Sequence, residues 1–184
     1  MEWVIDTMPK NKDKEIKTNV MRILDGWSVD YRYYTYECGE FIDALHTARS
    51  LNQPPEKLYK TLVTEGAPRQ YYVFVIPIAM ELDLKKAARV VGTKSLAMIP
   101  VKDINFVTGY IRGGCTSIGM KKKYPTVIDS SANHRKSIIV SGGRIGLQIE
   151  LAPEDLLRVT SAQFADVVAG TISVGEMEKS QSGE

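Results

Sequence analysis

The amino-acid sequence predicts a mixed α/β fold in a single domain. Its 184 residues are a common length for one domain, and a hydrophobic content of 43% is ordinary for a globular core. Segments with the period of a helix and segments with the composition of a strand follow one another without a strict βαβ rhythm. We expect residues 14–174 to form the domain, with 1–13 as a flexible lead and 175–184 as a disordered polar tail.

The first half of the chain alternates between helical and extended patterns. Apolar spacing and tyrosine-rich or β-branched runs predict helices over 16–26, 41–51 and 83–92, and strands over 30–36, from 60 onward and over 71–76. Pro54 and Pro55 end the second helix, and residues 56–59 are expected to form a short helical turn. Asp83 is suited to cap the third helix, and Gly92 is suited to end it.

The second half predicts shorter strands and one further helix. The strands are expected near 95–98, 126–129, 137–140 and 146–151. Pro153, followed by two acidic residues, is typical of a helix start. We expect Phe164, Val167 and Val168 to close the core.

Bulk charge and cysteine usage exclude several classes of protein. A net charge of +2 excludes a generally basic nucleic-acid coat, so any RNA contact must come from a local cluster. No apolar run approaches the roughly 20 residues that span a bilayer, so no membrane partner is predicted. Cys38 and Cys115 have no spacing pattern, which predicts a reduced, cytoplasmic protein. Two distant histidines, His46 and His134, predict neither a metal site nor a catalytic base.

Two glycine-rich segments and one lysine carry the functional signal. The first segment runs from Thr108 to Gly119 and is followed by Lys121, Lys122 and Lys123, and the second covers 140–151. Paired glycines let a backbone approach a ligand closely and direct its N–H groups inward. Adjacent cations indicate an anionic ligand, most simply one that carries phosphate. Lys60 lies upstream, at the edge of an apolar run.

Each of these features also has a purely structural interpretation. A lysine at a strand end is usually solvated, as Lys60 would then be. Glycine pairs are most often tight turns, and Ser141-Gly142-Gly143 lies between two predicted strands, where a hairpin turn is expected. Tyr36 would pack across strands. Cys115 has no histidine in a partner arrangement, so it is not expected to be a nucleophile.

In their order and spacing, these segments resemble the YbaK/EbsC family of free-standing aminoacyl-tRNA deacylases. The resemblance runs from about Tyr31 to Val168. The matching pieces are Thr35-Tyr36-Glu37, Tyr59-Lys60-Thr61-Leu62, Leu82-Asp83-Leu84-Lys85-Lys86, Thr108-Gly109-Tyr110, Gly113-Gly114 and Ser141-Gly142-Gly143. The resemblance implies a central, mostly antiparallel, barrel-like sheet flanked by helices.

The resemblance also implies a function: hydrolysis of mischarged tRNA(Pro), most typically Cys-tRNA(Pro), by the substrate's own thiol and without a cofactor. It leaves open whether prolyl-tRNA synthetase is a partner. The residues it assigns fall into three groups. Catalysis is expected from Lys60, Gly113 and Gly114; substrate binding from Tyr36, Thr108, Gly109, Ser141, Gly142, Gly143 and Gln148; and tRNA contact from Arg112, Lys121, Lys122 and Lys123.

Two positions depart from the family pattern, and two other functions remain open. Ser117 replaces a proline of the family loop, and Gln148 replaces an acidic residue that some relatives carry. Because glutamine cannot accept a proton, no general base is assigned there. The chain could instead edit another small residue such as alanine, where water must be activated, or be a non-catalytic RNA- or nucleotide-binding module of the same fold.

Overall fold

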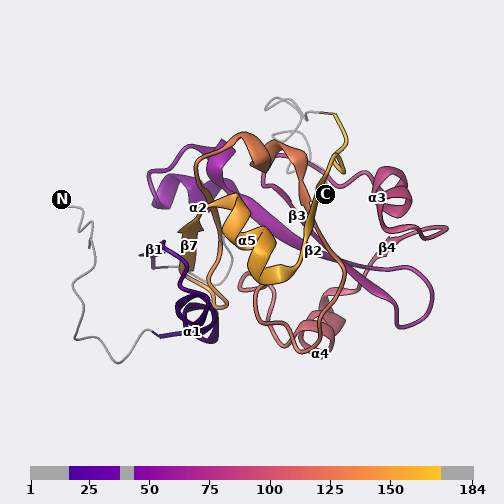
Figure 1. Cartoon of the computed structure of the whole chain (residues 1–184), viewed down its shortest axis with the longest axis horizontal. Helices are drawn as coiled ribbons and strands as arrows, with labels where there is room; N and C mark the ends of the chain where they lie inside the picture. Colours follow the sequence, from indigo (N-terminus) through magenta and orange to yellow (C-terminus); the bar gives the residue numbers. More distant parts are fainter. Residues whose placement is uncertain (1–16, 38–43, 171–184) are drawn as a thin grey trace, which may run out of the picture.

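Two open sheets make up the framework of this computed structural model, which describes residues 17–37 and 44–170 (Figure 1). The smaller sheet has the order β1-β7-β6, with β1 (Tyr31–Thr35), β7 (Leu147–Leu151) and β6 (Ile138–Ser141). The larger sheet has the order β4-β2-β3-β5-β8, with β4 (Ala97–Met98), β2 (Tyr59–Glu65), β3 (Tyr71–Pro77), β5 (Thr126–Asp129) and β8 (Gln163–Ala165).

The mixed α/β prediction is confirmed, but the barrel-like sheet is not. The smaller sheet is antiparallel throughout, whereas β5 pairs in parallel with both β3 and β8. Neither sheet closes on itself, because β1, β6, β4 and β8 each have a neighbour on one side only in the described ladders. The two sheets adjoin at a single isolated parallel bridge between Leu58 and Ile139.

Five α-helices and three short 3₁₀ helices are described around these sheets. The α-helices are α1 (Asn19–Gly26), α2 (Ala44–Ser50), α3 (Leu84–Val91), α4 (Ile104–Thr108) and α5 (Pro153–Thr160), and the 3₁₀ helices are η1 (Pro55–Lys57), η2 (Val101–Asp103) and η3 (Ser130–His134). The predicted caps are confirmed: Asp83 accepts from the amides of Lys85 and Lys86, and Gly92 ends α3 in the left-handed region with φ of 71°.

The sequence did not predict four short elements. These are α4, η2, η3 and β8, each three to five residues long. Segments this short do not contain enough residues to express a period of 3.6 or 2. The predicted ends of the domain, 1–13 and 175–184, lie outside the described residues, as do Phe41 and Ile42. No helix in the described part is both long and apolar enough to cross a membrane.

The strands divide the core into layers through the alternation of their side chains. In the smaller sheet, Val140, Leu147 and Ile149 face α1 and α5, in the main buried cluster. In the larger sheet, Phe74 and Ile76 pack against α3. The opposite face of the same strands packs against α4 through Val63, Val73 and Val107.

Candidate functional site

A row of polar side chains crosses the seam between the two sheets. Two residues beyond the Leu58–Ile139 bridge stand Lys60 on β2 and Ser141 on β6. Ser141 pairs with Gln148 on β7, and Gln148 pairs with Tyr34 on β1. Because side chains alternate across a strand, Lys60, Ser141, Gln148 and Tyr34 all project to the same side. We call these four residues the polar row.

An apolar cluster borders the polar row on the same side. Leu58, Ile139 and Ile78 are buried there together with Ala48 and Leu51 of the α2 segment. Tyr34 and Tyr36 pack against this cluster as partly buried neighbours. The row therefore combines polar groups with a nearby apolar surface, which is the usual composition of a small-molecule site.

Lys60 is the only cation of the polar row. Its Nζ lies 3.6 Å from Oε1 of Glu81, and the two side chains are 26% and 62% exposed. A long ion pair with so exposed a partner contributes little to stability. The ammonium group is thus held at the site by a weak constraint and remains available to an anionic or polarised ligand.

Tyr36 and Gln148 meet at the other end of the row. The Gln148 side chain is 8% exposed, and its Nε2 donates to the Tyr36 hydroxyl at 3.5 Å. The Tyr36 amide donates to the Gly146 carbonyl at 3.0 Å, which fixes β1 to the tip of the second glycine segment. Both residues are predicted from the sequence to bind substrate, and the structure places them in contact.

A buried carboxylate beside the row was not singled out from the sequence. Glu150 is 8% exposed and lies two residues beyond Gln148 on the same face of β7. It accepts from Lys57 Nζ at 2.9 Å and from the hydroxyls of Tyr34 and Ser137. Burial raises the Glu150 pKa, but the Ser137, Tyr34 and Lys57 hydrogen bonds outweigh it and hold the pKa below its usual value.

The Glu150 cluster joins three elements around the polar row. Lys57 belongs to η1, which leads directly into the strand of Lys60, whereas Tyr34 lies on β1. Burial and the bond to Glu150 raise the pKa of Tyr34 to about 12, so the phenol stays protonated as a donor. The signal that could have revealed this cluster is a charged residue inside the strand of 147–151, whose other residues are uncharged.

The two glycine segments touch through their backbones. A Cβ added to Gly114 would come within 2.9 Å of the Arg144 Cα and 3.1 Å of the Ile145 amide nitrogen. A Cβ on Gly113, whose φ is 86°, would lie 3.5 Å from Cγ1 of Ile145. Gly114 therefore has to be glycine for the first segment to lie against the second.

The amides of these glycines are not equally available. The Gly114 N–H donates to the Ile111 carbonyl at 3.0 Å, and the Gly142 N–H donates to the Leu147 carbonyl at 2.9 Å. Gly143 N lies 3.5 Å from Ser141 Oγ. Within the described chain, the Gly113 N–H has no hydrogen-bond partner, which makes it the candidate donor for a ligand oxygen.

The second glycine segment forms the predicted hairpin turn and is anchored to α1. Thr18 caps α1, and its hydroxyl donates to the Gly142 carbonyl at 3.1 Å. A Cβ on Gly143 would meet Val20 Cγ2 at 2.8 Å, and one on Gly142 would meet Leu147 Cγ at 2.7 Å. These two glycines therefore have a packing role whether or not they also line a site.

Thr108 and Gly109, which were predicted to bind substrate, end helix α4. The Thr108 side chain is 1% exposed; its hydroxyl donates to the Ile104 carbonyl at 2.7 Å and accepts from the Tyr110 amide at 3.0 Å. Gly109 is left-handed with φ of 87°. These contacts stabilise the end of α4, where the first glycine segment begins.

The first glycine segment is held on one side by Tyr110. The Tyr110 hydroxyl donates to the Ile118 carbonyl at 2.6 Å, and burial raises the pKa of Tyr110 to about 12. Ser117, which stands where the family has proline, places its hydroxyl oxygen in a buried position where no described residue is its hydrogen-bond partner. A buried hydroxyl without a partner costs free energy, so Ser117 is a destabilising feature of this loop.

Burial also decides the chemistry of Cys115. Its thiol packs among Val63, Val73 and Val107, and this burial raises its pKa to about 11. At neutral pH the group is a protonated thiol, which is a poor nucleophile. Within residues 17–37 and 44–170, no three His, Cys, Asp or Glu side chains lie close enough together to hold a metal ion.

The cations expected to contact tRNA lie on the outside of the first glycine segment. Arg112, Lys122 and Lys123 are exposed, and Lys121 is exposed while its Nζ donates to the Phe106 carbonyl at 3.4 Å. They share a surface with α4 and are not part of the polar row. A substrate that used both would extend from the seam of the sheets to this surface.

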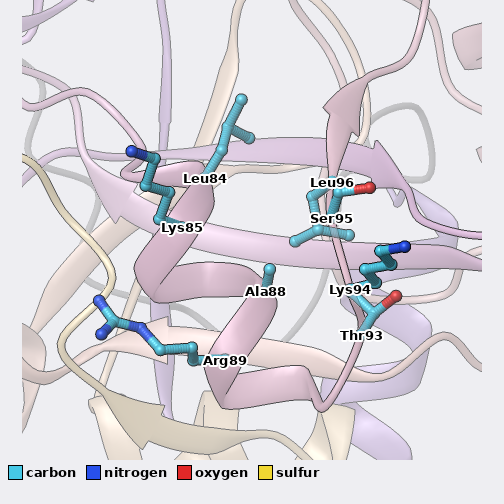
Figure 2. Close-up of a pocket in the computed structure, with 8 residues that line it drawn as sticks. All are labelled: Leu84, Lys85, Ala88, Arg89, Thr93, Lys94, Ser95 and Leu96. Atoms are coloured by element: carbon cyan, nitrogen blue, oxygen red, sulfur yellow. The ribbon is translucent and has the colours of Figure 1, made fainter.

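A separate hollow of about 530 Å³ lies between α3 and residues 93–96 (Figure 2). Its floor is apolar, with Ala88 and Leu96, while Lys85, Arg89 and Lys94 stand on its rims. The hollow contains none of the residues of the polar row or of the glycine segments.

Comparisons with known proteins agree on one family. The family model "Aminoacyl-tRNA editing domain" matches residues 42–159. A protein of Enterococcus faecalis, described as a candidate Cys-tRNA(Pro)/Cys-tRNA(Cys) deacylase, EbsC, is 45% identical over 161 residues, which cover 87% of this chain and 98% of that protein.

Solved structures with lower identity show the same fold. A crystal structure of a candidate trans-editing enzyme for prolyl tRNA synthetase has a TM-score of 0.71 at 23% identity, over 84% of this chain and 99% of that one. The crystal structure of hypothetical protein APE2540 has a TM-score of 0.75 at 22% identity, over 82% and 99% of the two chains.

Proposed function

The chain belongs to the aminoacyl-tRNA editing domain family, as its resemblance to YbaK/EbsC deacylases predicted, and on this premise we propose that it clears mischarged tRNA(Pro), with Cys-tRNA(Pro) as the preferred substrate. Family and relative make it an aminoacyl-tRNA deacylase, a hydrolase of the ester bond in mischarged tRNA. The substrate choice and the mechanism below are our inference. Such a substrate also implies action in the cytoplasm.

The observation that carries the proposal is the composition of the polar row. It supplies one ammonium group, two hydroxyls and one amide, and it contains no thiol, imidazole or carboxylate. Two carboxylates touch the row, and neither is a strong base. Glu150 is held by Lys57, Tyr34 and Ser137 and has a lowered pKa, and Glu81 is 62% exposed and paired with Lys60. A row of this kind can orient an ester and stabilise negative charge, but it has no strong base with which to activate water.

A substrate that brings its own nucleophile fits this row. The cysteine thiol loses its proton to solvent, and its sulfur forms a bond to the carbonyl carbon of the same residue. The ester C–O bond breaks, and its electron pair leaves with the ribose oxygen, which takes a proton from water. Water then opens the cyclic thioester, so the net reaction is hydrolysis.

The protein would contribute position and charge to this reaction. Lys60 offers a fixed positive charge to the carbonyl oxygen as negative charge develops on it, and the Gly113 amide is a second donor of suitable kind. Holding the sulfur near the carbonyl replaces an encounter by a step within one molecule. Tyr36 and Gln148 would hold the aminoacyl or adenosine end against the apolar cluster.

Editing of alanine is the second candidate, and it needs a positioned water. Gln148 supports it, because its buried amide could hold a water near the ester even though it cannot take a proton. A non-catalytic RNA-binding module is the third. Prolyl-tRNA synthetase could supply tRNA specificity in either editing reaction, since one protein of the same fold is a candidate trans-editing enzyme for that synthetase.

One panel of substrates tests these proposals together. Purified protein is incubated with Cys-, Ala-, Ser- and Pro-tRNA(Pro) and with Cys-tRNA(Cys), each with and without prolyl-tRNA synthetase. We expect Cys-tRNA(Pro) to be deacylated fastest. Faster loss of Ala-tRNA(Pro) would move the assignment to a water mechanism, and binding without any deacylation would establish the non-catalytic module.

A further inference from the structure

Positive charge is concentrated in the middle of the chain, although the net charge of the whole sequence is small. Residues 104–149 contain seven lysines and arginines and a single acidic residue, Asp129, although the chain as a whole has a net charge of only +2. Asp129 is 2% exposed and its carboxylate accepts from the amides of Ser131 and Val167. The exposed surface of this segment is therefore basic, in a chain whose remainder has more acidic than basic residues.

This basic segment also exposes an aromatic side chain. Phe106 on α4 is 78% exposed, the highest value among the large hydrophobic residues of the described chain. Helix α4 packs into the core through Val107 and Ile104, so Phe106 is not needed for that packing. Ile111 and Ile145 are also exposed, at 53% and 45%.

Contacts link Phe106 to the two glycine segments. Lys121 Nζ donates to the Phe106 carbonyl at 3.4 Å, and a Cβ on Gly109 would lie 3.1 Å from Cγ of the same lysine. Gly113 lies against Ile145, as described above. The first glycine segment connects these two groups of contacts, and six exposed residues lie beside it, which we call the α4 face. Its members are Phe106, Ile111, Arg112, Lys121, Arg144 and Ile145.

We propose that the α4 face binds the RNA part of the substrate, with Phe106 stacked on an unpaired base and Lys121 and Arg144 against neighbouring phosphates. The inference rests on the proposed function, in that it takes an aminoacyl-tRNA as the ligand. Aromatic platforms flanked by cations are the usual means of holding single-stranded nucleic acid. Sequence-tolerant stacking also suits an enzyme that handles one invariant RNA end.

The charge around Phe106 favours RNA over a protein partner. Lysine is depleted in the cores of protein–protein interfaces, whereas Lys121, Lys122 and Lys123 are all exposed and Lys121 donates to the Phe106 carbonyl. The α4 face is also connected to the polar row along the chain, because the turn that carries Arg144 and Ile145 begins after Ser141.

The first test measures RNA binding without any need for turnover. Uncharged tRNA(Pro), and a hairpin RNA with or without an unpaired 3′ end, are titrated with wild type and with Phe106→Ala, Phe106→Leu and Phe106→Trp. Stacking of about 1–3 kcal/mol per base predicts that Ala and Leu weaken binding of the RNAs with an unpaired end roughly 5- to 150-fold. Phe106→Trp is expected to retain RNA binding. Leu84→Ala on α3 serves as the matched control for loss of an exposed apolar side chain.

The second test separates binding from chemistry. Phe106→Ala should raise KM for Cys-tRNA(Pro) while single-turnover deacylation at saturating enzyme changes little. Arg144→Gln should lower the slope of log Kd against log salt by about 0.7–0.9, and Lys94→Ala, on the hollow of Figure 2, should not.

Two outcomes would overturn the inference. In the first, the Ala and Leu variants bind RNA as wild type does; in the second, they lose affinity for prolyl-tRNA synthetase but not for RNA, which would make the α4 face a protein-docking surface. If Phe106→Ala does not fold, the comparison of RNA binding by Phe106→Leu and Phe106→Trp tests the stacking. Failure of the proposed function gives a different result, namely wild-type RNA binding with no deacylation of any substrate.

Discussion

The backbone of Gly114 lies directly on the backbone of Arg144, so closely that a Cβ at Gly114 would approach the Arg144 Cα to 2.9 Å. This contact joins the first glycine segment to the hairpin that follows Ser141. It explains why a glycine is needed at 114 even though its amide is already bonded to the Ile111 carbonyl. The shape of the site therefore depends on this contact as much as on any charged group.

Gly114→Ala should separate the two glycine segments. The clash is with backbone atoms, which cannot move aside as a flexible side chain can, so we expect a loss of stability of about 1–3 kcal/mol and a strongly reduced deacylation rate. Thermal unfolding and a deacylation assay check this. Gly26→Ala is the matched control, because a Cβ there would meet nothing within 4 Å. Equal behaviour of the two variants would contradict the packing argument.

Most of the fold followed from local sequence patterns. The helix of 83–92 was predicted with both of its caps, because Asp83 and Gly92 act through their own backbone neighbours. The seam between Leu58 and Ile139 could not be predicted, because it joins residues far apart in the chain and has no local signature. The barrel-like sheet that the resemblance implied is not confirmed, because both sheets are open in the described ladders.

The sequence named part of the candidate site, but it named neither Tyr34 of the polar row nor the neighbouring Glu150, and the roles of the named residues stay predictions. Lys60, Ser141 and Gln148 were named from the sequence, and the pairing of three strands brings them into one row. Thr108 was named as well, yet its hydroxyl is used inside α4. Glu150 was missed because a charged residue in a strand becomes informative only once its burial and its donors are known.

Lys60→Ala should remove most deacylation and leave the fold intact. The ammonium group is the only cation of the polar row, and loss of a preorganised charge typically costs about 3 kcal/mol in the transition state, or roughly 100-fold in rate. The weak pair with Glu81 predicts little change in stability. Lys94→Ala is the control for loss of a lysine elsewhere. Near wild-type turnover in folded Lys60→Ala would refute the assignment.

Glu150→Gln should make the free energy of unfolding depend less on pH in the acidic range. The pKa of Glu150 is held below its usual value of 4.5, so its contribution is fully present above that value and is lost as the pH falls through the lower pKa of the folded protein. We expect the variant to be less stable than wild type at pH 7, with the difference in the free energy of unfolding shrinking below about pH 4.5.

Urea unfolding between pH 7 and pH 3 measures this difference. Asp155→Asn is the control, because the Asp155–Arg158 pair lies at the surface, with side chains 28% and 50% exposed, and such pairs contribute about 0–1 kcal/mol. A Glu150→Gln deficit that stayed constant down to pH 3 would show that the effect comes from packing and not from the charge.

Cys115→Ser should keep substantial activity. Burial raises the pKa of the Cys115 thiol to about 11, so almost none of it is thiolate at neutral pH. In a Cys38→Ser background, a thiol reagent should react with Cys115 far more slowly at pH 8 than with free cysteine. Loss of activity in a folded variant, together with an aminoacyl thioester trapped on Cys115 of the wild type, would restore the thiol as the nucleophile. Cys115→Ala separates this from the cost of burying a hydroxyl.

The chemistry of the substrate provides the most direct prediction about mechanism. Serine is nearly isosteric with cysteine, but its hydroxyl is scarcely ionised near neutral pH, whereas a few per cent of a thiol is. If the substrate supplies the nucleophile, Ser-tRNA(Pro) should bind comparably and yet be hydrolysed much more slowly than Cys-tRNA(Pro). A pocket that only measures size would separate the two by no more than the roughly 1–3 kcal/mol that small steric differences allow. Single-turnover deacylation of both at saturating enzyme makes the comparison. Equal rates would exclude the substrate thiol as the nucleophile and leave Gln148 as the residue that positions a water. Gln148→Ala should then abolish both reactions.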